Sequence, residues 1–137
     1  MIALILLAQV SLSNSSHDTA YYNSLIDVVC SELEVVLDER PALKVVVISQ
    51  ETMQKLVSHN PCRWDSEWQG SFNPPGLIFL TPESDDTFIH EFLHWLRFHG
   101  LFFVGWEDQL LIEKAIREME GSLLGSESYL KFLSQSP

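Results

Sequence analysis

The hydrophobic pattern of the first half of the chain predicts two helices and one strand. Apolar residues recur at intervals of three or four over 17–37, which predicts an amphipathic helix. The β-branched run at 43–48, LKVVVI, predicts a central strand. Ser49 can cap a short helix that continues to about residue 58.

The second half of the chain continues this mixture of element types. The segment 76–80, GLIFL, predicts a short apolar strand between two prolines. Helices are predicted over 106–120 and 126–134, with Gly121 and Gly125 interrupting the pattern between them. These elements together predict an α+β fold in a single domain over residues 1–137.

A helix is also predicted over 87–100, in the middle of this half. Ser84, Asp85 and Asp86 precede it and can cap its first amides, and the two acids suit the positive end of a helix dipole. Gly100 can end it. Apolar residues occupy most of its positions, so we expect this helix to be buried on most sides.

Two segments allow more than one interpretation. Residues 1–10, MIALILLAQV, are predicted as a strand that opens the domain, or alternatively as a truncated signal sequence, followed by a polar linker at 11–16. Residues 60–75 are predicted as a long loop, either a flap that binds apolar substrate side chains or a cover for the core. Its aromatic residues are Trp64, Trp68 and Phe72.

Composition narrows the class of partner. The formal net charge is −11, which argues against nucleic acid and anionic membrane surfaces and mildly favours neutral or cationic peptides. The apolar N-terminal stretch is too short to span a bilayer, and the compartment stays open between cytoplasmic and secreted. Cys30 and Cys62 either pair or remain a core residue and a loop thiol, and neither belongs to a zinc-binding Cys-x-x-Cys motif.

The chemistry of the chain concentrates in His90-Glu91-Phe92-Leu93-His94. On a helix, His90 and His94 lie about 40° apart and one turn above each other, so both imidazoles can bind one Zn²⁺. Glu91 lies beside that face, where its carboxylate can reach a water on the metal without ligating the metal.

Glu113 is the predicted third ligand. Eighteen residues separate it from His94, and in this His-Glu-x-x-His-x18-Glu spacing the chain resembles the gluzincins, the thermolysin-like and aminopeptidase-like zinc peptidases. The run from Gly105 to Ala115 is similar to the segment that carries the ligand glutamate in the aminopeptidases.

Other residues compete for the third position or depart from the family pattern. His99 is one residue too early for the metzincin spacing and is predicted to be a surface or core-polar residue. Glu107 fits the first turn of its helix, while Glu118 and Glu120 fit a solvated face. Arg117 stands where thermolysin-like enzymes place an aspartate that orients a histidine.

The resemblance implies a zincin-like minimal catalytic domain with a small mixed sheet, an active-site helix and a glutamate helix. It implies one Zn²⁺ per chain, held by His90, His94 and Glu113, and hydrolysis of peptide bonds by a metal-activated water with Glu91 as general base. It also implies that the strand at 76–80 is an edge strand, whose backbone binds an extended peptide substrate at Gly76, Leu77 and Ile78. Tyr129 is a weak candidate for the residue that steadies the oxyanion.

Two other functional classes remain open from the sequence. The first is a zinc-binding interaction or regulatory protein with the same fold and weak or no catalysis. Retention of Glu91 argues against it, because a purely structural site needs no base. The second is an apolar helical core in which the His-Glu-x-x-His pattern is accidental.

Overall fold

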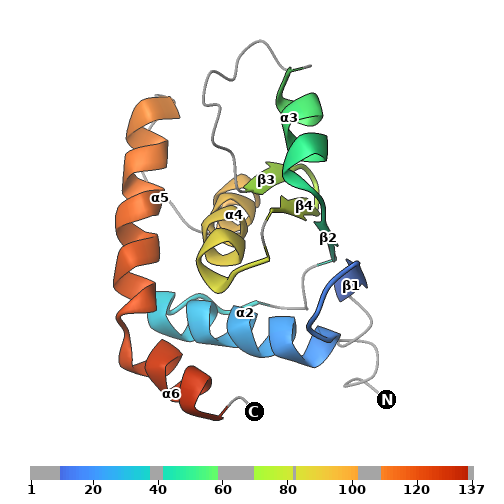
Figure 1. The fold of residues 1–137 in the computed structure, drawn as a ribbon. Helices are drawn as coiled ribbons and strands as arrows, with labels where there is room; N and C mark the ends of the chain where they lie inside the picture. The colour runs from blue at the N-terminus through green and yellow to red at the C-terminus, as the bar shows by residue number, and fades with distance from the viewer. Residues whose placement is uncertain (1–9, 38–41, 59–69, 82, 102–108, 136–137) are drawn as a thin grey trace.

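A four-stranded mixed sheet lies at the centre of the molecule, for which a computed structural model describes residues 10–37, 42–58, 70–81, 83–101 and 109–135 (Figure 1). β1, β2 and β4 run parallel to one another, and β3 pairs antiparallel with β4. The spatial order is β1-β2-β4-β3, so β4 is internal and β3 lies at an edge. The bounds of the strands are β1 Val10–Ser13, β2 Leu43–Val47, β3 Gly70–Asn73 and β4 Leu77–Leu80.

Helices pack around this sheet and give the α+β architecture expected from the sequence. α4 contacts β3 and β4 on one side, and α2 and α5 elsewhere. Figure 1 shows α5 beside α4, with α2 crossing below them and α6 packed against α2. The described helices are α2 Thr19–Leu33, α3 Gln50–Ser58, α4 Asp85–Phe98, α5 Gln109–Leu124 and α6 Glu127–Gln135. Among the described residues, no helix has the length and hydropathy needed to cross a membrane.

α4 is the most deeply buried helix of the described fold, as its composition predicted. Its apolar side chains join one core cluster with residues of α2, the sheet, α5 and α6. This packing fixes the rotation of α4 about its own axis, which decides where its polar residues point. The residues of α4 with no exposed surface are Phe88, Ile89, Phe92, Leu93 and Leu96.

The helix α4 begins and ends close to where the sequence predicted, but one of the predicted capping contacts is not formed. Gly100 adopts a φ of +73°, and its amide donates to the carbonyl of Arg97, which ends the helix as predicted. At the other end, Asp86 accepts the amide of Thr87 at 2.9 Å. Ser84 is the N-cap residue, but its hydroxyl donates to the Thr87 hydroxyl instead of accepting a helix amide.

Several predicted boundaries are wrong for identifiable reasons. Residues 11–13, predicted within a polar linker, belong to β1, because parallel pairing with β2 provides backbone partners despite the polar side chains of Ser11 and Ser13. Residues 70–73, predicted within a loop, form β3. The helix predicted over 17–37 ends at 33, because Glu34 takes a left-handed conformation with φ of 56°. α5 continues through Gly121 to 124.

The predicted place of the substrate strand is also wrong. β4 is paired with β2 on one side and β3 on the other, so residues 76–80 do not form a sheet edge. The carbonyl of Gly76 accepts the amide of Lys44, while Leu77 and Ile78 lie opposite partners in both neighbouring strands. Gly76, Leu77 and Ile78 therefore lack the free backbone edge on which their predicted substrate binding depended.

Three other predictions from the sequence concern residues that lie partly outside the described ranges. The proposed N-terminal strand over 1–10 is described only at Val10, and the aromatic loop is described only from residue 70 onward. Cys30 is buried on α2, whereas Cys62 lies outside the described residues.

A polar network ties the segment before α4 to the N-terminal part of the chain. Glu83 accepts hydrogen bonds from the Tyr22 hydroxyl, the Ser15 hydroxyl, and both the amide and hydroxyl of Ser16. Asp85 accepts hydrogen bonds from the hydroxyls of Tyr21 on α2 and Tyr129 on α6, at 2.6 and 2.7 Å. The two carboxylates thus join α2, α4 and α6.

Replacing Glu83 with glutamine should lower the stability of the protein at neutral pH. Burial alone would raise the pKa of Glu83, but hydrogen bonds from Ser15, Ser16 and Tyr22 lower it from 4.5 to about 2. A depressed carboxyl pKa stabilises the fold above about pH 4.5, and that contribution is lost as the pH falls towards 2. After allowance for solvent screening, we expect a loss of about 1–2 kcal/mol at pH 7.

Urea unfolding of wild type and Glu83→Gln at pH 7 and pH 2.5 measures this difference. The difference should shrink at the lower pH, and Glu32→Gln, which removes an exposed carboxylate on α2, should match wild type. The same difference at both pH values would contradict the assignment.

Candidate metal centre

His90 and His94 lie one turn apart on α4, as the helical spacing requires. Their ring centroids are 5.1 Å apart, and both side chains are largely buried. The neighbouring positions Ile89 and Leu93 are completely buried in the core. Because the core fixes the rotation of α4, the two imidazoles point away from it and towards α5.

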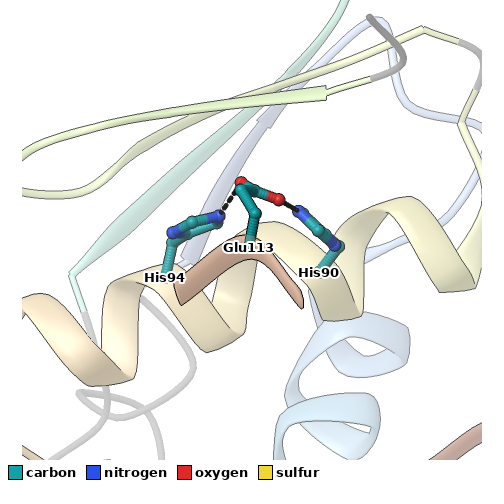
Figure 2. Close-up of side chains that lie close together, drawn as sticks. All are labelled: His90, His94 and Glu113. Carbon is teal, nitrogen blue, oxygen red and sulfur yellow. Dashed lines mark hydrogen bonds and ion pairs between the residues drawn. The ribbon is translucent and has the colours of Figure 1, made fainter. Parts of the chain in front are cut away.

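Glu113 of α5 lies between the two imidazoles (Figure 2). Its Oε2 is 3.0 Å from Nε2 of His90, and its Oε1 is 2.8 Å from Nε2 of His94. Ile112 and Ile116 of α5 are buried in the core. Their packing fixes the rotation of α5 about its axis and therefore the direction in which Glu113 points. The structure therefore brings together the three residues that the sequence predicted as metal ligands.

The donor set and spacing of this cluster fit a zinc ion. One possible ligand atom from each of His90, His94 and Glu113 lies within 4.8 Å of the other two. A tetrahedral zinc ion with ligands at about 2.0–2.1 Å separates neighbouring ligand atoms by about 3.3 Å. Small movements of the three side chains would bring their ligand atoms from the observed spacing to the tetrahedral spacing. Two imidazoles and one carboxylate also match the nitrogen and oxygen preference of catalytic zinc sites, which keep a fourth position open.

The electrostatics of the cluster reflect this close grouping. Burial alone would lower the pKa of His90, but its hydrogen bonds with Glu113 and Glu120 outweigh burial and raise the pKa to about 10. Burial alone would raise the pKa of Glu113, while hydrogen bonds from His90 and His94 hold it well below its usual range. Only a neutral imidazole can ligate a metal, so a bound ion would displace the proton on His90.

Glu91 lies beside the face of α4 that carries the two histidines, about 60° from His94 around the helix axis. It is one residue from His90, or about 100° around the helix axis. Its side chain is buried and lies against Gly70 of β3. The predicted base is therefore adjacent to the histidine cluster but separate from the contacts that Glu113 makes.

Glu120 is a functional candidate for which the predicted solvated position is wrong. Its Oε1 is 2.8 Å from Nδ1 of His90, and only 20% of its side chain is exposed. Glu120 follows Glu113 by seven residues, so the two side chains lie within about 20° of each other on α5. That spacing was the available signal, because a carboxylate on the ligand's own helix face can reach the same cluster.

Glutamine in place of Glu120 should weaken zinc binding without removing a ligand. A carboxylate on the second nitrogen of a metal-bound histidine fixes its tautomer and increases its basicity, and its loss typically costs 10–100-fold in affinity. Competition with a chromophoric chelator would measure the affinity. Glu118→Gln, on the exposed side of α5, is the matched control and should bind zinc as wild type does. Equal affinity of Glu120→Gln and wild type would show that this contact does not support the metal.

None of the other candidates that the structure describes joins the cluster. His99 is exposed, contacts the carbonyl of Pro75 and lies against the Trp95 ring, in keeping with its predicted surface role. Glu107 lies outside the described residues, and Glu118 is exposed on α5. The hydroxyl of Tyr129 donates a hydrogen bond to Asp85. Burial, and to a smaller extent this hydrogen bond, raise the pKa of Tyr129. The weak candidacy of Tyr129 as an oxyanion donor therefore loses support.

Arg117 lies one turn beyond Glu113, and its Nε is 3.8 Å from Oε2 of Glu113. It therefore does not take the place of the aspartate that orients a histidine in thermolysin-like enzymes.

Comparison with known proteins found no matching family model, no similar curated protein and no similar solved structure.

Proposed function

We propose that this protein is a zinc-dependent metallopeptidase with a gluzincin-like ligand set and a zincin-like arrangement of its helices and sheet. One observation carries the proposal. The Nε2 atoms of His90 and His94 converge on the carboxylate of Glu113, which comes from a second helix, while Glu91, the residue after His90, is buried. An accidental His-Glu-x-x-His pattern would not require that convergence.

His90, His94 and Glu113 would hold the zinc ion. When bound, zinc supplies a Lewis acid that polarises a carbonyl oxygen and lowers the pKa of water towards about 7. Glu113 leaves part of its side chain, 39%, exposed to solvent, so a substrate can approach the cluster from that side.

Glu91 would act as the general base. A buried carboxylate next to the histidine cluster can accept a proton from the attacking water and donate it to the leaving amine. Core packing of α4 holds the backbone of Glu91 in place, so its carboxylate needs little reorganisation during the reaction.

The substrate would be an extended peptide paired with β3. In the described sheet, β3 has β4 as its neighbour on one side and no strand on the other. The backbone groups of an edge strand can hydrogen-bond an added strand, which is a common mode of peptide recognition. This replaces residues 76–78 with residues 70–73 as the proposed substrate strand, and the net charge of −11 favours neutral or cationic peptides.

A zinc-binding interaction protein is the second candidate, and one observation favours it. Tyr129, the weak candidate for an oxyanion donor, is hydrogen-bonded to Asp85. Loss of such a donor typically lowers the catalytic rate by about 10²–10³-fold, so a protein without one would be a weak enzyme.

Digestion of a peptide library separates the two functions. The zinc-loaded protein should cleave a subset of the peptides, a chelator should stop cleavage, and added zinc should restore it. Mass spectrometry of the products would identify the bonds. Failure of the fully zinc-loaded protein to cleave any peptide would favour the interaction protein.

A further inference from the structure

Gly70, the first residue of β3, lies directly against the side of α4 that carries Thr87 and Glu91. An ideal Cβ at Gly70 would lie 2.6 Å from Cγ2 of Thr87 and 3.0 Å from both Cγ and Oε2 of Glu91. Contacts below 3.0 Å are essentially never made by real Cβ atoms. The φ of Gly70 is not positive, so alanine could adopt its backbone conformation, and lack of space is the reason for glycine.

The neighbours of Gly70 have little freedom to move away. Thr87 is buried, its hydroxyl oxygen accepts a hydrogen bond from Ser84 at 2.8 Å, and its amide donates to Asp86. A β-branched side chain in a helix also has few alternative rotamers. Glu91 is buried as well, so a methyl group at Gly70 would displace its carboxylate or separate β3 from α4.

The contacts of the candidate ligands are made with α5. His90 and His94 contact Glu113, and His90 also contacts Glu120, whereas the three atoms nearest to a Cβ at Gly70 belong to Thr87 and Glu91. A change at Gly70 therefore meets the base before it meets either histidine.

We propose that Gly70 is a positioning residue for Glu91, which rests on the proposed function of Glu91 as general base. The bare backbone of β3 at Gly70 forms the wall against which the Glu91 carboxylate packs. That wall holds the carboxylate beside the histidine cluster and keeps it from turning away from the metal. The same glycine links the proposed substrate strand to the base, because it is part of β3.

The test uses a variant in which the worst steric conflict is removed. Gly70→Ala alone would force Cβ against Thr87 and can fail to fold. In Gly70→Ala/Thr87→Ser the Cγ2 atom at 2.6 Å is absent and the serine hydroxyl can still accept from Ser84, so the conflict with Glu91 remains. Gly121→Ala is the matched control, because an ideal Cβ there meets no atom within 4 Å.

We expect the double variant to keep about one zinc per chain while its kcat falls about 10–100-fold, with most of the loss in kcat and not in KM. Gly121→Ala should retain wild-type kcat. In the background of Glu91→Gln, the change at Gly70 and Thr87 should have no further effect on the residual rate, because the group it positions is gone. Wild-type kcat in the double variant, or the same fold loss in the Glu91→Gln background, would overturn the proposal.

A spectroscopic measurement separates this proposal from the proposed function. The side-chain carboxyl ¹³C resonance of Glu91, assigned by its loss in Glu91→Gln, should shift in the double variant and stay in place in Gly121→Ala. An unchanged resonance would overturn the role of Gly70 whether or not the protein cleaves peptides. A shifted resonance in a zinc-loaded protein that cleaves no peptide would overturn the peptidase function alone.

Discussion

Glu113→Ala should lose zinc while wild type retains about one zinc per chain. Glu113 is the side chain that joins the two imidazoles of α4 to α5, through contacts of 2.8 and 3.0 Å. Structural zinc sites gain about 10–16 kcal/mol from four ligands, so loss of one ligand costs on the order of 3 kcal/mol, or more than about a hundredfold in affinity. Elemental analysis after dialysis would measure the stoichiometry.

His99→Ala is the control for this experiment. His99 is exposed at the end of α4 and contacts Pro75 and Trp95, away from Glu113. The His99→Ala variant should retain the zinc content of wild type. Loss of zinc in His99→Ala with retention in Glu113→Ala would move the protein to a class with three histidine ligands, and absence of zinc from wild type would leave a buried helix that happens to carry the motif.

Glu91→Gln should reduce peptide cleavage by about 10²–10⁴-fold, the usual contribution of a general base. Glutamine has nearly the same shape as glutamate, so the packing of this buried side chain against β3 should persist. Zinc stoichiometry should stay near that of wild type, because Glu91 lies outside the contacts among His90, His94 and Glu113. Rates on a peptide identified by the library digest, measured beside the zinc content, give both readouts from one preparation.

Equal cleavage by wild type and Glu91→Gln would remove Glu91 from the mechanism. A joint loss of zinc and cleavage would instead indicate that Glu91 supports the metal site. Glu118→Gln, an exposed carboxylate on α5, should change neither quantity and controls for the effect of removing one negative charge.

Prediction from the sequence worked best where local periodicity and burial agree. The apolar positions of α4 specify a helix that is buried on most sides, and once that helix forms, a spacing of four residues places His90 and His94 on one face. The strands at β2 and β4 were likewise visible as short apolar runs. In each case the decisive physics lies within a few residues along the chain.

Prediction failed where the answer depends on pairing between distant segments. Residues 11–13, of which two are serines, become a strand because β2 lies beside them, and residues 70–73 become an edge strand because they pair with β4. Sheet order is not encoded in the local pattern of any one strand. The resemblance to the gluzincins implied that residues 76–80 form an edge strand, whereas β3 occupies that edge of the sheet.

The sequence by itself determined which histidines are candidate ligands, their spacing on α4 and the candidate base, since these follow from helix geometry and side-chain chemistry. Only the tertiary structure decided that Glu113 reaches both imidazoles, that Glu120 supports His90, and that Gly70 lies against Glu91. These contacts cross between α4, α5 and β3, and the rotation of each element about its own axis sets them. That rotation is fixed by the packing of the shared core, which forms only when the distant parts of the chain come together.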